Sequence, residues 1–387
     1  MEIVQVLNKK DEKLFMKVPL NLYNNDPQWI RPLDQDVEDV FNQKKNKSFR
    51  FGKMVRWILK DKEQKLIGRI AAFTNSKYKN KGDDFKVGGI GFFECINQME
   101  AARFLLDAAR DWLKQQGMQA MDGPINFGER DRWWGLLVSG FDAPLYGMNY
   151  NPPYYKELFE QYGLQVYYHQ LCFGMNTSSP LSEKMIKWHR HYEADPDFSV
   201  EHIRKNELER YASDFCTVYN KAWAKHGEGK TMDIKQAKLL FKKMKPVLDE
   251  DITWFVYHKG EPIGMWINLP DLNQYFKHFN GRFGLIQKLH FLWLHWRGTC
   301  NRFVGIVYGI VPEWQGKGTD AYMIEACNRK IQEKKRYKKY EMQWIGDFNP
   351  KMVNLAQNLD AVEVRRLSTY RYLFDREQPF HRHPFLK

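Results

Sequence analysis

The chain has 387 residues, 43% of them hydrophobic, and a net charge of +13. At about 150 residues per domain, this length predicts two domains with sizeable cores. The charge suits an anionic cofactor or partner, but so moderate an excess over a long chain gives no reason to expect nucleic-acid binding.

The cysteines are odd in number and scattered, without a Cys-x-x-Cys pair: Cys95, Cys172, Cys216, Cys300 and Cys327. They fit neither a disulfide framework nor a metal site, so no metal is expected and a reducing cytoplasm is predicted. The N-terminus lacks a basic region followed by an apolar run, which argues against a secretory signal. The most hydrophobic window, residues 283–296, is too short and too polar to span a bilayer. We therefore expect a soluble cytoplasmic protein.

In chain order, the first half predicts alternating short strands and helices. A strand and a helix precede a hairpin marked by Trp57 and Ile67-Gly68. The next helix has Ala101, Leu105, Ala108, Ala109 and Trp112 on one face and ends at Gly117. The expected elements are strand 2–6, helix 11–23, the hairpin, strand 87–96, helix 98–117, strand 119–123, helix 151–163 and strand 164–175.

The second half repeats this order. Trp254 and Ile263-Gly264 mark a second hairpin, and the "NPK" of Asn349 echoes the "NPP" of Asn151 at almost the same separation. The expected elements are strand 198–203, helices 206–223 and 233–244, the hairpin, strand 302–311, a helix after Gly318, strand 340–345, helix 349–359 and strand 362–374.

Two matches at nearly one offset indicate a tandem duplication. We predict an N-terminal domain over residues 1–176, a connection with a charged helix over 177–197, and a C-terminal domain over 198–387. Each copy has an insertion that the other lacks, near residues 270–298 in the second copy and 124–151 in the first. Long insertions in compact domains are often functional.

The stretch "GIVPEWQGKGTD", residues 309–320, combines a strand end, a glycine turn and a helix start. A Walker A loop is excluded because Lys317 is followed by Gly318 and Val311 stands where its first glycine belongs. A dinucleotide fingerprint is only half matched, and the surrounding strands predict an antiparallel meander. A glycine turn that only caps a helix is the plain alternative.

The third interpretation is a pyrophosphate loop. Gln315-Gly316-Lys317-Gly318 resembles the [RQ]-x-x-G-x-[GA] loop of the GNAT acyl-CoA-dependent N-acyltransferases, and it follows an apolar strand as it does there. The order of elements in both copies is similar to that superfamily, and the whole chain resembles tandem GNAT proteins, including a bacterial group of N-acetyltransferases. Glycines let backbone N–H groups face a pyrophosphate, and the helix N-terminus adds positive potential.

This resemblance implies an α/β (α+β) protein of two GNAT-like domains, each a mixed, mostly antiparallel sheet flanked by helices. Only the second copy has the cofactor loop; the first has lost it. Ile310 and Val311 would offer free backbone groups to the pantetheine arm, as an added strand would. The residues expected to contact acetyl-CoA or another acyl-CoA are Ile310, Val311, Gln315, Gly316, Lys317, Gly318, Thr319 and Asn349.

The chain departs from the GNAT pattern at two positions. Asp320 stands at the last [GA] position, where it either faces the pyrophosphate or caps the helix. Ala356 stands where the family often has a general-acid tyrosine. A thiolate leaving group with a pKa of about 8.5 needs little protonation, so this loss is tolerable.

Transfer to an amine needs a group that accepts its proton. The candidates are Tyr308 before the loop, Glu341 on the next strand, and Asp347 ahead of Asn349. Each has an ordinary structural role as the alternative. Tyr308 would pack in the sheet, Glu341 would be solvated, and Asp347 would cap its helix. For the acceptor we expect the insertion of the first copy to line a cleft facing the glycine loop, or else to form a surface loop anchored by tryptophan. Its polar and aromatic members are Asn126, Glu129, Arg130, Asp131, Trp133 and Trp134.

Residues 283–296 project as an amphipathic helix. Gln287, Lys288, His290 and His295 gather on one side; Leu285, Leu289, Leu292, Trp293 and Trp296 gather on the other, while Phe291 and Leu294 break the pattern. We interpret the apolar stripe as core packing. A lid over an acyl chain or an interfacial membrane contact is the alternative.

Together these observations predict an N-acyltransferase that moves an acyl group, acetyl being expected, from acyl-CoA to a small-molecule or peptide amine. The alternative is a catalytically inactive GNAT-fold binding or regulatory protein, and a nucleic-acid partner is suggested by charge alone.

Overall fold

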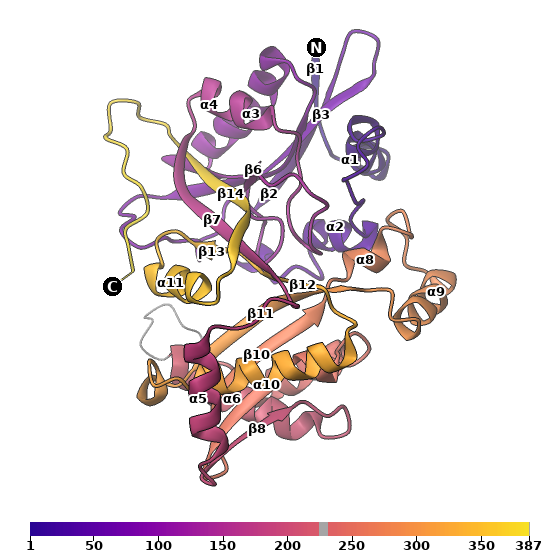
Figure 1. The fold of residues 1–387 in the computed structure, drawn as a ribbon. Coiled ribbons are helices and arrows are strands. Elements are labelled where there is room, and N and C mark those ends of the chain that lie inside the picture. Colours follow the sequence, from indigo (N-terminus) through magenta and orange to yellow (C-terminus); the bar gives the residue numbers. More distant parts are fainter. Residues whose placement is uncertain (224–230, 387) are drawn as a thin grey trace.

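The computed structural model describes residues 1–223 and 231–386 (Figure 1). Within that part of the chain the strands form one continuous sheet in the order β1-β2-β3-β4-β5-β14-β7-β12-β11-β10-β9-β8, with β6 paired to β14 and β13 paired to β7. Helices pack on its faces, which confirms the predicted mixed architecture.

The first copy contains β1 (Glu2–Gln5), α1 (Lys9–Leu22), α2 (Asp34–Phe41), η1 (Lys47–Arg50), β2 (Met54–Lys60), β3 (Leu66–Phe73), β4 (Val87–Cys95), α3 (Met99–Gln115), β5 (Ala120–Gly123), β6 (Leu136–Ser139), α4 (Tyr155–Tyr162) and β7 (Gln165–Asn176). The predicted charged helix of the connection is α5 (Glu183–Glu193).

The second copy contains β8 (Phe198–His202), α6 (Leu208–Trp223), α7 (Ile234–Met244), η2 (Glu250–Ile252), β9 (Trp254–His258), β10 (Glu261–Pro270), α8 (Asn273–Phe276), α9 (Leu285–Trp296), β11 (Arg302–Ile310), η3 (Pro312–Trp314), α10 (Thr319–Lys334), β12 (Lys339–Met342), β13 (Ile345–Gly346), α11 (Pro350–Asn358) and β14 (Val362–Leu373).

The hairpins and helices follow the sequence patterns that predicted them. The tight turn between β9 and β10 holds Lys259 and Gly260 at positive φ, a conformation in which glycine is unstrained. In α3 the residues Ala101, Leu105 and Ala109 are completely buried against the sheet. In each copy one pair of neighbouring strands is parallel, β4 with β5 and β11 with β12, and the other neighbours are antiparallel.

The last strand of each copy belongs to the sheet of the other. β14 pairs with β5 of the first copy, Tyr370 opposite Gly123, and β7 pairs with β12 of the second, Met175 opposite Tyr340. β7 and β14 also pair with each other in the middle of the sheet (Figure 1). The sequence did not predict this exchange. The division of the chain at residues 177–197 stays a prediction, since the sheet runs through both copies.

Buried arginines of β14 hold the exchanged strand. Arg371 forms ion pairs with Asp83 at 2.6 Å and with Asp122 at 2.7 Å, and all three side chains are almost fully buried. Burial alone would raise the pKa of Asp83, but the hydrogen bonds and charge of Arg371 outweigh burial and hold that pKa below its usual value. The cluster therefore ties the end of the chain to the first copy.

Removing this arginine should strongly destabilise the protein. Arg371→Leu leaves two buried carboxylates without their partner, and we expect a loss of about 3–5 kcal/mol at pH 7 in urea unfolding. Because the folded-state pKa of Asp83 is depressed, wild-type stability from this pair should fall as pH drops through that pKa, and the difference between the proteins should shrink there. Arg366→Leu is the control, since its pair with Glu363 is largely exposed and contributes about 0–1 kcal/mol. Equal losses in both variants would contradict this role.

Candidate functional site

The strand pair ahead of the glycine loop opens. β11 and β12 run parallel from Arg302 opposite Lys339 to Gly305 opposite Met342, where β12 ends. β11 continues to Ile310, while the chain after β12 turns away to form β13 against β7. In the described part of the chain no strand pairs with β11 on this side beyond Gly305. In this part of the chain the edge of β11 beyond Gly305 is therefore open on the side away from β10.

The loop presents free backbone donors. Gly316 and Gly318 have φ of 73° and 82°, the left-handed conformation that suits glycine. Among the described residues no hydrogen-bond acceptor faces the N–H groups of Gly316, Gly318, Thr319 and Asp320. These groups stand at the start of α10, where helix N–H groups are unpaired and the potential is positive. Such an arrangement binds anions, phosphates above all.

The connection helix α5 holds the loop in shape. A Cβ atom on Gly318 would lie 2.3 Å from the ring of Trp188, and Tyr192 donates a hydrogen bond of 2.6 Å to the Lys317 carbonyl. The Lys317 ammonium lies 5.0 Å from the centre of the Trp314 ring. Gly318 thus has two structural reasons to be glycine, its φ and the contact with Trp188.

The strand end is less open than the resemblance implied. The Val311 N–H donates to the Ile263 carbonyl, and the Val311 carbonyl accepts from Trp314, both at 2.9 Å. The Ile310 carbonyl accepts the side-chain amide of Gln315 at 2.9 Å. The expectation of free backbone groups at Val311 is therefore wrong, because the chain turns into η3 there. At Ile310 a ligand amide would have to displace Gln315.

The corresponding opening in the first copy is closed by the chain itself. β4 and β5 pair only as far as Gly89 opposite Asp122, and the N–H of Ile125 then donates to the Ile90 carbonyl at 2.7 Å. Cys95 corresponds to Ile310, since each faces the glycine of its hairpin. Its N–H donates to Tyr155 and its carbonyl accepts from Tyr154, both at 2.7 Å.

These tyrosines are specific to the first copy. In the repeat, Tyr154 and Tyr155 correspond to Met352 and Val353, which offer no side-chain hydrogen bond. The two copies therefore share an opening between strands, but only the first copy fills it with its own residues.

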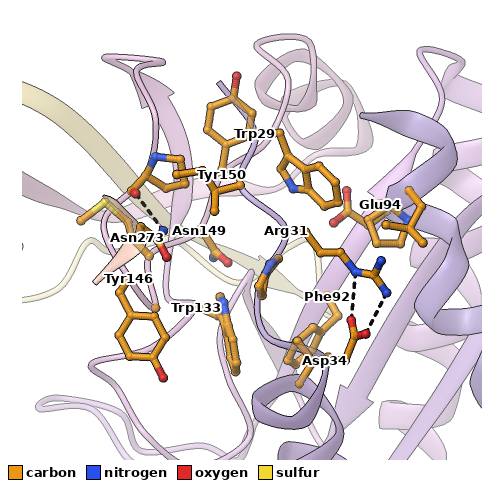
Figure 2. Close-up of a pocket in the computed structure, with 18 of the residues that line it drawn as sticks. Trp29, Arg31, Asp34, Phe92, Glu94, Trp133, Tyr146, Asn149, Tyr150 and Asn273 are labelled. Atoms are coloured by element: carbon orange, nitrogen blue, oxygen red, sulfur yellow. Dashed lines mark hydrogen bonds and ion pairs between the residues drawn. The ribbon is translucent and has the colours of Figure 1, made fainter. Parts of the chain in front are cut away.

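A separate pocket lies in the first copy (Figure 2). Its walls come from α1, residues 29–37, β4 and residues 144–150, with Asn273 of the second copy donating to the Pro144 carbonyl at 2.9 Å. Glu94 lies in its wall and accepts hydrogen bonds from Tyr23 at 2.7 Å and Tyr155 at 2.9 Å. Burial raises the pKa of Glu94, and its neighbours, Arg69 foremost, oppose the rise.

The charges of this pocket are compensated. Arg69 lies 3.4 Å from Glu94, and Arg31 binds Asp34 at 2.8 Å (Figure 2). Among the described residues that line it, none belongs to β11, the glycine loop or α10. The described part of the chain also contains no group of three or more His, Cys, Asp or Glu side chains placed to hold a metal ion.

Known proteins similar to this chain were found by sequence and by structure, although no family model matches it. The chain is 24% identical over 379 residues to a bacterial ceramide synthase of Caulobacter vibrioides (strain NA1000 / CB15N), with 96% of this chain and 97% of that protein covered. It is 25% identical over 375 residues to protein YghO of Escherichia coli (strain K12), covering 94% and 93%.

The similar solved structures are acetyltransferase folds. A tandem GNAT protein from the clavulanic acid biosynthesis pathway matches with a TM-score of 0.52 and 9% identity, covering 98% of this chain and 99% of that one. A GCN5-related glucosamine N-acetyltransferase region in a fungal multi-domain GH3 β-N-acetylglucosaminidase also gives a TM-score of 0.52, at 11% identity, with 96% of this chain but only 38% of that chain covered. The chain has the tandem GNAT fold.

Within this GNAT fold, the predicted catalytic residues differ in their surroundings. Tyr308 lies on the open part of β11; burial and, after it, the Asp320 carboxylate raise its pKa well above the ordinary value. Glu341 is buried between Arg365 at 2.7 Å and Arg302 at 3.4 Å, in an ion network of the second copy. Asp347 pairs with Arg382 at 2.5 Å. Glu341 and Asp347 are thus held in ion pairs, and the choice among the three candidates stays a prediction.

Two predicted cofactor contacts hold the GNAT scaffold. The Thr319 side chain is buried and donates to the Trp314 carbonyl at 3.3 Å, which closes the loop. Asn349 caps α11 by accepting from the N–H of Met352 at 3.4 Å. Asp320, by contrast, points to Tyr308 rather than only capping α10, as the effect on the tyrosine pKa indicates.

The predicted acceptor residues do not face the glycine loop. Trp133 and Trp134 are buried in the first copy with Ile125 and Phe127, and Trp133 alone of the predicted set lines the pocket. Their surroundings are as follows: Trp134 donates to Tyr168 at 2.8 Å, Arg130 to Asn80 at 2.9 Å and Asn126 to the Glu129 carbonyl at 3.5 Å, while Glu129 and Asp131 are exposed.

A cleft shared by this insertion and the loop is therefore a wrong prediction. The insertion ends beside Arg302 at the start of β11, where the Ala143 carbonyl accepts from that arginine, whereas the loop follows Ile310 at the other end of the strand. The cause is the strand exchange, which places the two insertions at the junction of the copies.

The contact between Gly318 and Trp188 can be tested by a double-mutant cycle. Gly316→Ala should lower the free energy of unfolding by about 1–2 kcal/mol, because alanine is strained in the left-handed conformation. No steric cost is added, since the new methyl group meets open space. Gly318→Ala should cost clearly more, because the methyl group meets Trp188 as well. In the background of Trp188→Ala the extra cost of Gly318→Ala should disappear, as measured by urea unfolding. An unchanged cost in that background would contradict the contact.

Proposed function

We propose that this chain is an N-acyltransferase that binds acyl-CoA at the opening of the second copy and transfers the acyl group to an amine. One observation carries the proposal: in the described part of the second copy no strand pairs with β11 beyond Gly305 on the side away from β10, the N–H groups of Gly316, Gly318 and Thr319 are unpaired, and the Ile310 carbonyl is covered by the Gln315 side chain, whereas Tyr154 and Tyr155 pair with both backbone groups of Cys95 in the first copy. A catalytically inactive binding protein, the alternative raised by the sequence, is not favoured by the likeness to acyl-transferring proteins.

The residues present fit a CoA thioester. The loop N–H groups and the N-terminus of α10 suit the pyrophosphate. The unpaired edge of β11 suits the amides of a pantetheine arm, once Gln315 releases the Ile310 carbonyl. Asp320 acts on Tyr308, whose pKa it raises after burial, and we expect its carboxylate to stay with that tyrosine when phosphate binds. The thioester would supply an activated acyl carbon and a thiolate leaving group.

Tyr308 has one consistent role in this reaction. Its raised pKa keeps the phenol protonated at neutral pH, so it cannot act as a general base. Once a ligand draws the phenol away from Asp320, its O–H can donate a hydrogen bond, but not its proton, to the departing sulfur, and the thiolate then leaves as such or takes its proton from solvent. The general base that takes the proton of the amine is not assigned.

The relatives guide the proposal for the acceptor. The chain aligns along nearly its whole length with a protein named a ceramide synthase, a name that describes the acylation of a long-chain amine. We therefore favour a lipid amine over the peptide amine that the sequence left open, and a long acyl chain over acetyl. A cytoplasmic location remains part of the proposal; in the described part of the chain no helix is long and apolar enough to cross a membrane.

Cofactor binding can be tested with a matched pair of variants. Acyl-CoA should raise the melting temperature, with about 2.7 kcal/mol of stabilisation at a hundredfold excess over Kd. Gly316→Glu adds a negative charge to the loop at a position where a Cβ atom meets nothing within 4 Å, and it should abolish most of the shift. Gly260→Glu is the control, since Gly260 has a similar positive φ of 79° and open surroundings in a distant turn. An undiminished shift in Gly316→Glu would place the cofactor elsewhere.

Catalysis is tested by following amide product from acyl-CoA and a long-chain amine by mass spectrometry. Tyr308→Phe should lower kcat several-fold. This is less than the roughly hundredfold loss that follows removal of a typical general acid, because a thiolate leaves readily without one. The melting shift with acyl-CoA should stay close to that of the wild type. A variant with unchanged kcat would remove Tyr308 from the mechanism.

A further inference from the structure

The helix α9 turns an apolar face to solvent. It stands at the edge of the molecule, beside α8 and away from the sheet (Figure 1). Six large apolar side chains along it are at least half exposed, with Ile286 at 77% and Trp296 at 80%; the others are Leu285, Leu289, Leu292 and Trp293. At 3.6 residues per turn these six positions share one face of the helix.

The opposite face fixes this orientation. Phe291 and Leu294 are the buried residues of α9, and Phe291 packs edge-on against Tyr275 of α8 with ring centres 5.1 Å apart. The Tyr275 hydroxyl lies 3.3 Å from Nδ1 of His295. The sequence interpretation of the stripe as core packing is therefore wrong. The two residues that break the stripe are the ones that anchor the helix.

The charge around this face has one sign. Residues 272–301 contain no aspartate or glutamate, and their four cations are all exposed: Lys277, Arg282, Lys288 and Arg297. In the described part of the chain none of these four forms an ion pair, and Arg297 lies over the Trp293 ring at 5.5 Å. An apolar stripe with tryptophans, in a segment whose charged side chains are all cations, is the composition of helices that lie in the interface of an anionic bilayer. A carboxylate of another element lies beside this segment, Asp34 at Gly281, and it is paired with Arg31.

We propose that α9 docks this protein on the surface of an anionic phospholipid bilayer. Its apolar face enters the boundary between headgroups and acyl chains, and the four cations contact lipid phosphates. The proposal does not depend on acyl transfer. Residues joining α8 to α9 are also bound to a wall of the pocket in the first copy, since the Asp34 N–H donates to the Gly281 carbonyl at 2.8 Å. Docking therefore places that wall close to the lipid surface.

The test is co-sedimentation of the full chain with vesicles of phosphatidylcholine alone and with added phosphatidylglycerol. The wild type should sediment with the anionic vesicles and much less with the neutral ones, and high salt should weaken binding. The triple variant Leu289→Gln, Trp293→Gln, Trp296→Gln should reduce the partition coefficient by about tenfold or more. A matched triple variant at other exposed apolar residues, Leu7→Gln, Leu239→Gln, Phe385→Gln, should bind as the wild type does.

A second variant guards against loss of folding. Lys288→Glu leaves the apolar stripe intact and should weaken binding to anionic vesicles but not to neutral ones, with the melting temperature of every variant measured alongside. Wild-type protein that stays in the supernatant with anionic vesicles would overturn the proposal. So would a concentration-dependent dimer that the α9 triple variant abolishes in the absence of vesicle binding, because the face would then serve a second copy.

Discussion

The exchange of β7 and β14 is the constraint on which the rest of the molecule depends. Because each copy is completed by the last strand of the other, neither half of the sheet is whole without a strand from the other copy. Buried arginines secure the exchange: Arg371 of β14 pairs with Asp122 of the first copy, and Arg365, paired with Glu341 of β12, donates to the Asp142 and Ala143 carbonyls of the first copy. These charges are costly to bury alone and are fully paired, so they favour this one arrangement of strands over alternatives. The same junction holds the insertion of the first copy through the Ala143 carbonyl.

On this shared frame the two copies have diverged at one place. Both leave a gap where a parallel strand pair separates, and the gap is a feature of the fold rather than of either copy. In the first copy Ile125, Tyr154 and Tyr155 satisfy the backbone groups there, which leaves none of the groups they pair with open to a ligand. In the second copy the Ile310 carbonyl pairs with the Gln315 side chain, and the remaining edge of β11 is left for a ligand. The glycine loop is held in its binding-ready form by Trp188 and Tyr192 of the connection helix, so the segment between the copies serves the site as well.

Sequence reasoning identified the features whose causes are local. The duplication, the hairpins, the glycine loop before α10 and the charged connection helix follow from turn chemistry and periodicity, and the structure has each of them. What it missed depends on distant contacts. Strand exchange leaves no local pattern, so the ion pair that Glu341 forms with Arg365 of β14 could not be predicted. Apolar periodicity in α9 defined a face but not its direction, and only the packing of Phe291 on α8 decided that the stripe points outward.

The account assigns acyl-CoA to one of two similar places, and hydrogen exchange can distinguish them directly. Backbone amide exchange of the full chain, measured by mass spectrometry with and without an acyl-CoA, should slow in residues 306–322, which hold the open edge of β11 and the loop N–H groups. The exchange rate of residues 90–100 in the first copy should not change. In that segment the backbone N–H and carbonyl of Cys95 are already paired with Tyr155 and Tyr154. Protection confined to residues 90–100, with none in the loop of the second copy, would contradict the central claim.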